Sequence, residues 1–375
     1  MYCSRRLSLI AFLAVLLSGV AGCQRVTTLV GAVVCQVPVG PVQRGPATRW
    51  TFRGLDARVR PRIRPGSYAS ETHGVHFPDP EHLGPHSYRL NWSEKNGIVY
   101  TCRGGHIDIA HVRKAADWTG FLAAYVLDRL QRGETRLRFR LWEPSVYTVE
   151  LTLPANWGLL STAQREQIAR DVSRGLGQYL AYTAMTWHEI LTWFGYRPKG
   201  YKTEFPSAFS WEDTYSNLLG TCIAAAALQD QERAFDEAVT AILQQQLEEL
   251  GVQPAHTARN VSRALRGQWY SRKGFLTTIS KRSFDVGLDD GCVTPCLVPM
   301  LPACEVAQGR LLPVPTLDFL AAYGFSARLE IEPRVWEAGK ILDVAYPNRS
   351  GRMRKLDPTV HFPRIMSHLE QSAGG

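Results

Sequence analysis

The chain has 375 residues, of which 45% are hydrophobic and 21% are charged. This balance excludes a disordered chain, a collagen-like repeat and a bundle of membrane spans, and it is typical of a globular protein. The formal net charge is +9, and the basic residues are spread along the chain without a nucleic-acid-binding motif. We therefore expect no nucleic-acid partner.

The N-terminus has the layout of a bacterial lipoprotein signal. A pair of arginines precedes an apolar stretch over Leu7–Leu17, which is too short for a permanent membrane span. The run VAGC at 20–23 resembles the sequence at which such signals are cut before a cysteine that then receives a lipid. We therefore predict a signal peptide over residues 1–22 and lipidation of Cys23. An ordinary secretory signal is the alternative.

The residue after this cysteine indicates the membrane. In bacterial lipoproteins an aspartate there favours retention in the inner membrane, and here the residue is Gln24. We therefore expect an outer-membrane lipoprotein that faces the periplasm and contacts the membrane through its lipid. Residues 23–66 are rich in proline, glycine and arginine, which predicts a lipidated tether and extended linker. Residues 67–375 are predicted to form a single large globular domain.

Cysteine usage fits an oxidising compartment. Setting aside the signal and Cys23 leaves six cysteines, which can form up to three disulfides: Cys35, Cys102, Cys222, Cys292, Cys296 and Cys304. The last three cluster in a proline-rich segment near 290–315, where we expect a bridge. A zinc knuckle in this cluster is the alternative, although the usual spacing needs a second matching pair.

Hydrophobic periodicity predicts a mixed fold. The run GIVYTCR at 97–103 is typical of a buried strand. Apolar and polar residues alternate over 137–141 and 147–153, which predicts a hairpin with one solvent-exposed face. A further strand is expected at 327–331. Helical patterns, two of them opened by capping boxes at Ser161 and Ser210, cover 107–132, 161–194, 210–227, 231–250 and 257–266. We predict an α+β fold that is predominantly helical with one small, mainly antiparallel sheet.

Three short segments concentrate the groups that can do chemistry. The first is GHIDIAHVR at 105–113, where Asp108 and His111 share a helix face and His106 lies nearby. The second is HEILTWFG at 188–195, and the third is FSWEDTYSN at 209–217. Helical spacing places His188 on an apolar face. Polar groups beside apolar helices make these segments the candidate pocket.

These segments also carry a family resemblance. The stretches TCRGGHIDIAHVRKAADW, HEILTWFGY and FSWEDTYSNLLG resemble a family of uncharacterised bacterial lipoproteins that is classified only as a domain of unknown function. The resemblance covers most of the chain after the signal. It implies no activity.

One hypothesis is a metal-dependent hydrolase that acts on an envelope substrate. The zincin motif H-E-x-x-H places two histidines on one helix face beside a glutamate, but here Thr192 replaces the second histidine. A site would therefore combine His188 with His111 and Glu212 as ligands, with Glu189 as general base and zinc as the candidate metal. Further candidates for the pocket are Asp108, His106 and Asp213.

Two alternatives remain open. One is a non-catalytic structural or interaction lipoprotein, in which the acids at 212 and 213 only complement a helix dipole and His188 is a hydrogen-bonded core histidine. The other is a relative of circularly permuted papain-like cell-wall hydrolases, which residues 97–113 and 214–219 resemble. No cysteine stands at the expected helix start, and Cys222 lies two turns further on. Cys102 with His111 is the remaining pair for that chemistry.

Overall fold

The computed structural model describes residues 50–64, 66, 69–70, 75–197, 203–273, 276–299, 301, 304, 307–347 and 354–374. The predicted signal peptide, the lipidated Cys23, Cys35 and most of the predicted tether lie outside the described residues. The structure therefore bears on the predicted globular part and on the last residues of the predicted linker.

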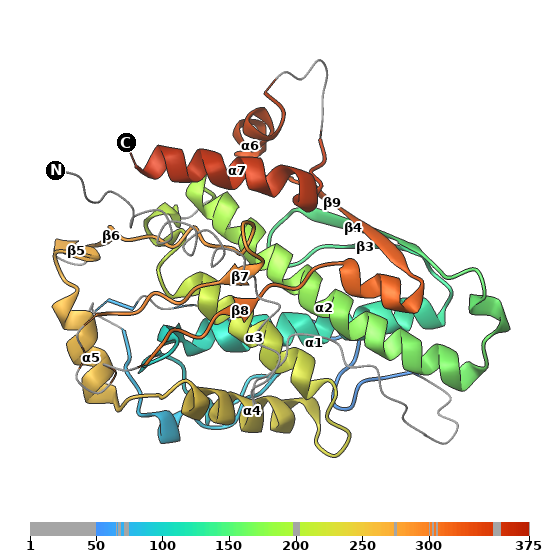
Figure 1. The fold of residues 1–375 in the computed structure, drawn as a ribbon, viewed down its shortest axis with the longest axis horizontal. Helices are drawn as coiled ribbons and strands as arrows, with labels where there is room; N and C mark the ends of the chain where they lie inside the picture. Colours follow the sequence, from blue (N-terminus) through green and yellow to red (C-terminus); the bar gives the residue numbers. More distant parts are fainter. Residues whose placement is uncertain are drawn as a thin grey trace, which may run out of the picture.

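Three helices form the centre of the molecule (Figure 1): α1 (Ile109–Gln131), α2 (Thr162–Trp193) and α3 (Asp213–Ala227). Helix α1 packs against both α2 and α3. The contacts are close enough to require glycine, because a Cβ on Gly177 would lie 2.7 Å from the nitrogen of Ala123, and one on Gly220 would lie 2.2 Å from the carbonyl oxygen of Val112. Close packing of these helices places their polar residues next to each other.

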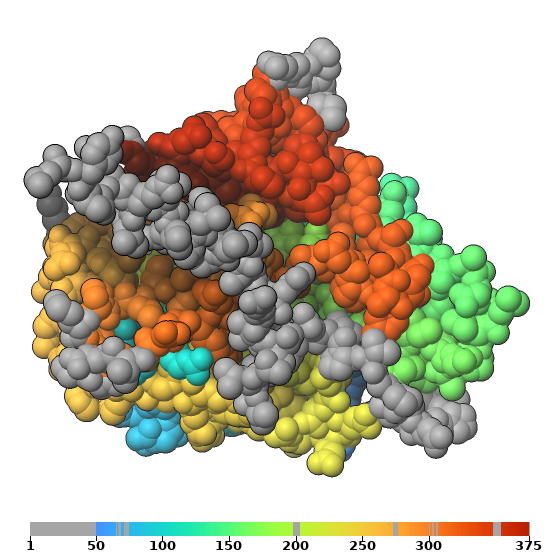
Figure 2. Space-filling model, in the orientation of Figure 1, coloured from blue at the N-terminus to red at the C-terminus, as the bar shows by residue number. Residues whose placement is uncertain are grey.

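The remaining helices surround this centre. Helix α4 packs against α3, α5 against the first strand, and α7 against both α6 and α2. Figure 2 shows orange segments of the C-terminal part in front of some of the central helices, whereas the red α7 lies along the upper edge. The outer helices are α4 (Phe235–Glu249), α5 (Ala255–Ala264), α6 (Ala338–Ala345) and α7 (Pro358–Ala373), with 3-10 turns η2 (Pro80–His82), η3 (Trp157–Leu159), η5 (Phe205–Ser207) and η7 (Asp318–Tyr323).

The strands in the described part of the chain form small antiparallel sheets. The largest has the order β3-β4-β9, in which the predicted hairpin pairs Phe139 with Tyr147 and gains a third strand that pairs Leu329 with Val149. The prediction of a mainly helical α+β fold is therefore confirmed. The strands are β1 (Ile98–Thr101), β2 (Gly105–Asp108), β3 (Arg136–Phe139), β4 (Val146–Thr152), β5 (Tyr270–Lys273), β6 (Leu276–Ile279), β7 (Cys292–Val293), β8 (Leu312–Pro313) and β9 (Ser326–Glu332).

Helix ends show where the local signals were right and where they were wrong. The predicted capping box at Ser161 is present, since its hydroxyl accepts from the Gln164 N–H and the Gln164 side chain accepts from the Ser161 N–H. The capping box predicted at Ser210 is wrong. Its hydroxyl donates instead to a carboxylate oxygen of Glu212, and α3 begins at Asp213 without a side-chain cap.

Residues 50–64 require a correction to the predicted extended linker. They form no helix or strand, as expected, but Trp50, Phe52 and Leu55 are buried in the main hydrophobic core. Arg64 is buried as well and binds both Glu94 and Asp117 on neighbouring elements. Aromatic and arginine side chains therefore attach this segment to the helices instead of leaving it on the surface.

The predicted disulfide is present, but its partners differ from those expected. Cys304 is bonded to Cys102, which lies 202 residues earlier, and Cys296 is a free thiol. The reason is tertiary, because residues after β7 cross the β1–β2 hairpin, where the Val298 N–H donates to the Tyr100 hydroxyl at 3.2 Å. Cys222 and Cys292 are also disulfide-bonded. These bonds leave Cys296 as the one free thiol among the described cysteines of this cluster, which is too few for a zinc knuckle.

Within the described ranges, no helix combines the length and apolar character that crossing a membrane requires.

Candidate functional site

The β1–β2 hairpin and the start of α1 position the first two site residues. Asp108 is the last residue of β2 and caps α1, since one carboxylate oxygen accepts from the Ala110 N–H at 2.8 Å. The Asp108 N–H donates to the Ser216 hydroxyl on α3 at 3.0 Å. The other carboxylate oxygen lies 2.8 Å from Nδ1 of His111, one helical turn further along. The strand-to-helix junction therefore fixes both side chains.

The start of α3 positions Asp213 through a strained turn. Phe209 has a φ of 52°, a left-handed conformation that is rare for a residue with a side chain and costs about 1–3 kcal/mol. Its N–H donates to a carboxylate oxygen of Glu189 on α2 at 2.8 Å, and its carbonyl accepts from the Ser283 N–H. The turn leads directly into α3, whose first residue is Asp213.

Asp108, His111 and Asp213 form a group that could hold a metal ion, with ligand atoms all within 4.8 Å of one another. Oδ1 of Asp213 lies 3.1 Å from Nδ1 of His111, which already contacts Asp108. This Asp213 oxygen is buried and has no hydrogen-bond partner. Nδ1 of His111 carries at most one proton and lies closer to Asp108, so Oδ1 of Asp213 is left with a longer, weaker contact than a buried carboxyl oxygen normally has.

Around Asp213 the negative charges outweigh the positive charge of Lys114. Burial raises the pKa of Asp213 well above its usual value, and the negative charges of Glu189, Glu212 and Asp108 raise it further. Burial also raises the pKa of Glu212 to about 7. Four carboxyl groups therefore share one interior region of the fold.

The donor set fits a divalent cation. Ligand atoms about 2.1 Å from a metal lie about 3.0–3.4 Å from one another in octahedral or tetrahedral geometry. The contacts of Nδ1 of His111 to Asp108 and Asp213, 2.8 and 3.1 Å, are close to those separations. One histidine and two carboxylates suit zinc, manganese or iron, and three protein ligands leave coordination positions open.

The predicted ligands are arranged differently from the expectation. Among the described residues, His111 groups with Asp108 and Asp213, not with His188 and Glu212. Glu212 is turned the other way, since its oxygens accept from the Ala69 N–H at 2.7 Å and the Ser210 hydroxyl at 2.6 Å.

His188 contacts Glu143 instead, with 2.7 Å between Nδ1 and the carboxyl oxygen.

The other predicted pocket residues also have defined places. Glu189, the predicted general base, is buried next to the Phe209 turn and its charge acts on Asp213. His106 is buried between the rings of Tyr100 and Trp211, and burial lowers its pKa to about 3. It is therefore a neutral imidazole in an aromatic layer.

Sequence reasoning missed two ionisable residues near the site. Glu143 lies in the β3–β4 turn, where the sequence Glu-Pro-Ser indicated only a loop. Lys114 is one turn beyond His111 on α1, and its ammonium stacks 4.7 Å from the centre of the Trp142 ring. The i, i+3 spacing from His111 was the available signal for Lys114. Glu143 carried no such signal, because its contact with α2 is set by tertiary packing.

The cysteines proposed for papain-like chemistry are occupied. Cys102 and Cys222 are both disulfide-bonded, so neither offers a thiolate while its bond is intact. Cys296 is a free thiol whose pKa is raised by burial, which opposes thiolate formation.

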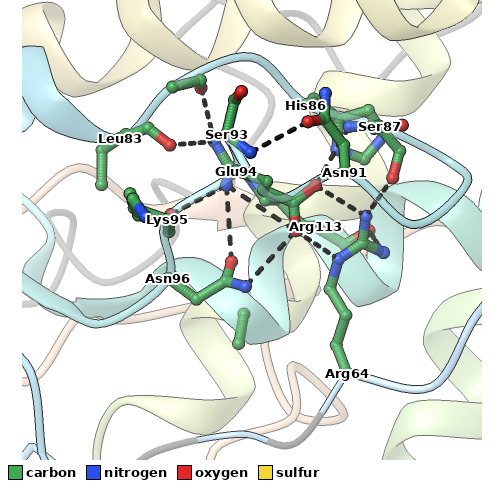
Figure 3. A network of polar contacts seen from close by, with 12 residues as sticks. Arg64, Leu83, His86, Ser87, Asn91, Ser93, Glu94, Lys95, Asn96 and Arg113 are labelled. Atoms are coloured by element: carbon green, nitrogen blue, oxygen red, sulfur yellow. Dashed lines mark hydrogen bonds and ion pairs between the residues drawn. The ribbon is translucent and has the colours of Figure 1, made fainter.

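A separate polar network attaches the segment before β1 to the first half of α1 (Figure 3). Arg64 binds both oxygens of Glu94, at 2.9 and 3.0 Å, and also contacts Asp117. Arg113 donates to the backbone carbonyls of Lys95 and Gly84 at 2.8 and 2.9 Å. This network supports the helix that carries His111.

Comparison with known proteins gives a family but no activity. A family model described as "Protein of unknown function (DUF4056)" matches residues 72–289, more than half of the chain. The matched region contains all the site residues described above. No curated protein and no solved structure matches the chain significantly.

Proposed function

Because the chain belongs to the DUF4056 family of proteins of unknown function, we propose its function from the site itself. We propose that Asp108, His111 and Asp213 hold a divalent metal ion and that the protein is a metal-dependent hydrolase of the cell envelope. The buried Oδ1 of Asp213 carries this proposal, because it makes no hydrogen bond within the described part of the chain and a cation between it, Nδ1 of His111 and Asp108 would bind it.

The surroundings support catalysis more than a purely structural role. A bound divalent cation with open positions supplies a Lewis acid and lowers the pKa of a bound water. Glu189 is the candidate general base, since its charge acts on Asp213 and one of its oxygens is fixed by the Phe209 N–H. His111 retains some exposure, 14% of its side chain, although Gly66 packs against its imidazole ring.

We further propose that the protein is exported and lipid-anchored at Cys23, on the periplasmic side of the outer membrane. The signal-like residues 1–23 support this location. The Cys102–Cys304 disulfide also fits an oxidising compartment. An envelope polymer or lipid is then the expected substrate class, because an anchored enzyme meets these molecules at the membrane surface.

Metal analysis of the full chain, purified in detergent, tests the proposed site. We expect about one zinc or manganese ion per chain, and we expect Asp213→Asn and His111→Gln each to lower the Zn²⁺ affinity at least a hundredfold. The matched control is Asp79→Asn. Asp79 belongs to the other described group with metal-ligand geometry, which is formed with the exposed Glu81 and His82.

Two results would contradict the proposal. One is a wild-type chain that takes up no metal above background. The other is a metal content that Asp213→Asn leaves unchanged while Asp79→Asn abolishes it.

A further inference from the structure

A second polar pair lies beside the proposed metal site, between α2 and the β3–β4 turn. Nδ1 of His188 lies 2.7 Å from Oε1 of Glu143, whose side chain is fully buried. The same nitrogen is 3.3 Å from the indole N–H of Trp142. The turn is fixed to α2 a second time, because the Trp187 indole N–H donates to the Ser145 hydroxyl at 3.0 Å. One edge of the imidazole is therefore held rigidly.

On its opposite edge, His188 faces Glu204. Its Nε2 lies 3.8 Å from a carboxylate oxygen of Glu204, whose side chain is 40% exposed. The imidazole stands edge-to-face with the rings of Trp142 and Tyr196, and 16% of its side chain reaches solvent. A buried carboxyl on Nδ1, with Nε2 on the opposite edge of the ring, gives the orientation that a proton-transferring histidine needs.

The pair and the metal group share neighbours. The positive charge of Lys114 lowers the pKa of Asp213 in the metal group, and it also lowers the pKa values of Glu143 and His188. Glu189, next to His188 on α2, likewise acts on both Asp213 and His188. The His111 charge also acts on His188. The two sets of groups therefore border one region.

We propose that His188, positioned by Glu143, is the general acid of this site. This inference rests on the proposed hydrolase function. In the step, Glu189 accepts a proton from the attacking water, whose oxygen forms the new bond to the substrate. The bond to the leaving oxygen or nitrogen breaks, and that atom takes the proton from Nε2 of His188. The proton held by Glu189 returns to His188 through solvent, which restores both groups.

The effect of burial on the two pKa values supports the role of this pair as a proton donor. Burial raises the pKa of Glu143 to about 8, and burial lowers the pKa of His188 to about 4. Between pH 4 and pH 8 the pair therefore holds two protons. One is shared between Oε1 of Glu143 and Nδ1 of His188, and the second is on Nε2 of His188. The charged groups facing His188 are Lys114 and His111 from α1, Glu204 from the segment before η5, and Glu189 from its own helix.

Carbethoxylation by diethyl pyrocarbonate, followed by mass spectrometry, tests this assignment on the full chain. The reagent needs an accessible, unprotonated nitrogen, so we expect His188 to react with a pH midpoint near 8 instead of the ordinary 6.5. Glu143→Gln should make His188 react about tenfold faster at pH 7, because the shared proton is gone. Buried His106 and exposed His368 serve as internal references.

Several outcomes would overturn the proposal. They are a wild-type midpoint near 6.5, equal rates in wild type and Glu143→Gln, or a His188 as unreactive as His106 at every pH. The wild-type profile decides the question even if Glu143→Gln fails to fold.

Zn²⁺ binding separates this inference from the proposed function. His188→Gln should keep its Zn²⁺ affinity within about threefold of wild type, whereas Asp213→Asn loses it. If His188→Gln loses affinity equally, His188 is a ligand and the general-acid assignment is wrong while the hydrolase proposal stands. If the wild type binds no metal, the hydrolase proposal fails, and the carbethoxylation profile still judges the Glu143–His188 pair.

Discussion

The network around Glu94 should make the stability of the fold strongly dependent on pH in the acid range. Burial alone would raise the pKa of Glu94, but the hydrogen bonds and charge of Arg64, helped by Arg113, outweigh burial and lower this pKa to about 2. The ordinary value is 4.5. The difference corresponds to about 3 kcal/mol of folding stability. Glu94→Gln removes this contribution.

The sign follows from the direction of the shift. A carboxyl with a depressed folded-state pKa stabilises the fold fully above its unfolded value, near 4.5, and loses this effect as the pH falls through about 2. At pH 3 about 1.5 kcal/mol of the contribution remains. Glu94→Gln also leaves Arg64 with Asp117 as its remaining carboxylate partner, but that loss is the same at both pH values. The variant should therefore lose about 2 kcal/mol more at pH 7 than at pH 3.

Urea denaturation of wild type and variant at pH 7 and pH 3 measures this difference. Glu81→Gln is the matched control, because Glu81 is exposed on the nearby η2 turn. The free energy of unfolding of this control should differ from that of wild type by less than about 0.5 kcal/mol at both pH values, as is usual for surface substitutions. A Glu94→Gln destabilisation that is equal at pH 7 and pH 3 would refute the reasoning, since it would show that the carboxylate charge is not what Arg64 stabilises.

Two further predictions concern packing and anchoring. Gly220→Ala should lower the free energy of unfolding by about 1–3 kcal/mol, because its Cβ would lie 2.2 Å from the Val112 carbonyl oxygen, whereas Gly158→Ala, where no atom lies within 4 Å, should not. Denaturation midpoints compare the two, and equal midpoints would contradict the packing argument. Cys23→Ser should release the protein from membranes or stall its processing, as measured by membrane fractionation, and a processed variant that stays membrane-bound would exclude lipidation at Cys23.

Local patterns predicted the elements of the fold better than their assembly. The capping box at Ser161 and the alternation in the β3–β4 hairpin depend on residues near in sequence, and both are present in the structure. The start of α3 was misplaced because Ser210 bonds to the Glu212 side chain instead of to the backbone of the next turn. Cys304 was assigned to the wrong neighbourhood because its partner, Cys102, lies on a hairpin reached only through the tertiary fold.

In the candidate site, too, local contacts could be predicted from the sequence and contacts between distant segments could not. The i, i+3 spacing of Asp108 and His111 could be read from the sequence, and the two side chains are in contact. Which acid of α3 would join them could not be read, because Glu212 and Asp213 are adjacent and their side chains point in different directions. The Ser210 hydroxyl and the Ala69 N–H hold Glu212, which leaves Asp213 for His111. Such a choice depends on hydrogen bonds from distant segments.

The unfavourable features of this region occur together, which argues against a purely structural origin. The left-handed Phe209 costs about 1–3 kcal/mol. Four residues later, the buried Oδ1 of Asp213 lacks a hydrogen bond, which costs about 1–3 kcal/mol more. Starting a helix requires neither feature, since Ser or Asn at the cap would do so with favourable hydrogen bonds. Both features place the carboxyl group of Asp213 against His111. A bound cation would remove the cost of burying the Asp213 oxygen. Backbone strain and a buried carboxyl oxygen without a hydrogen bond, both at one helix start, are therefore better explained by ligand binding than by folding.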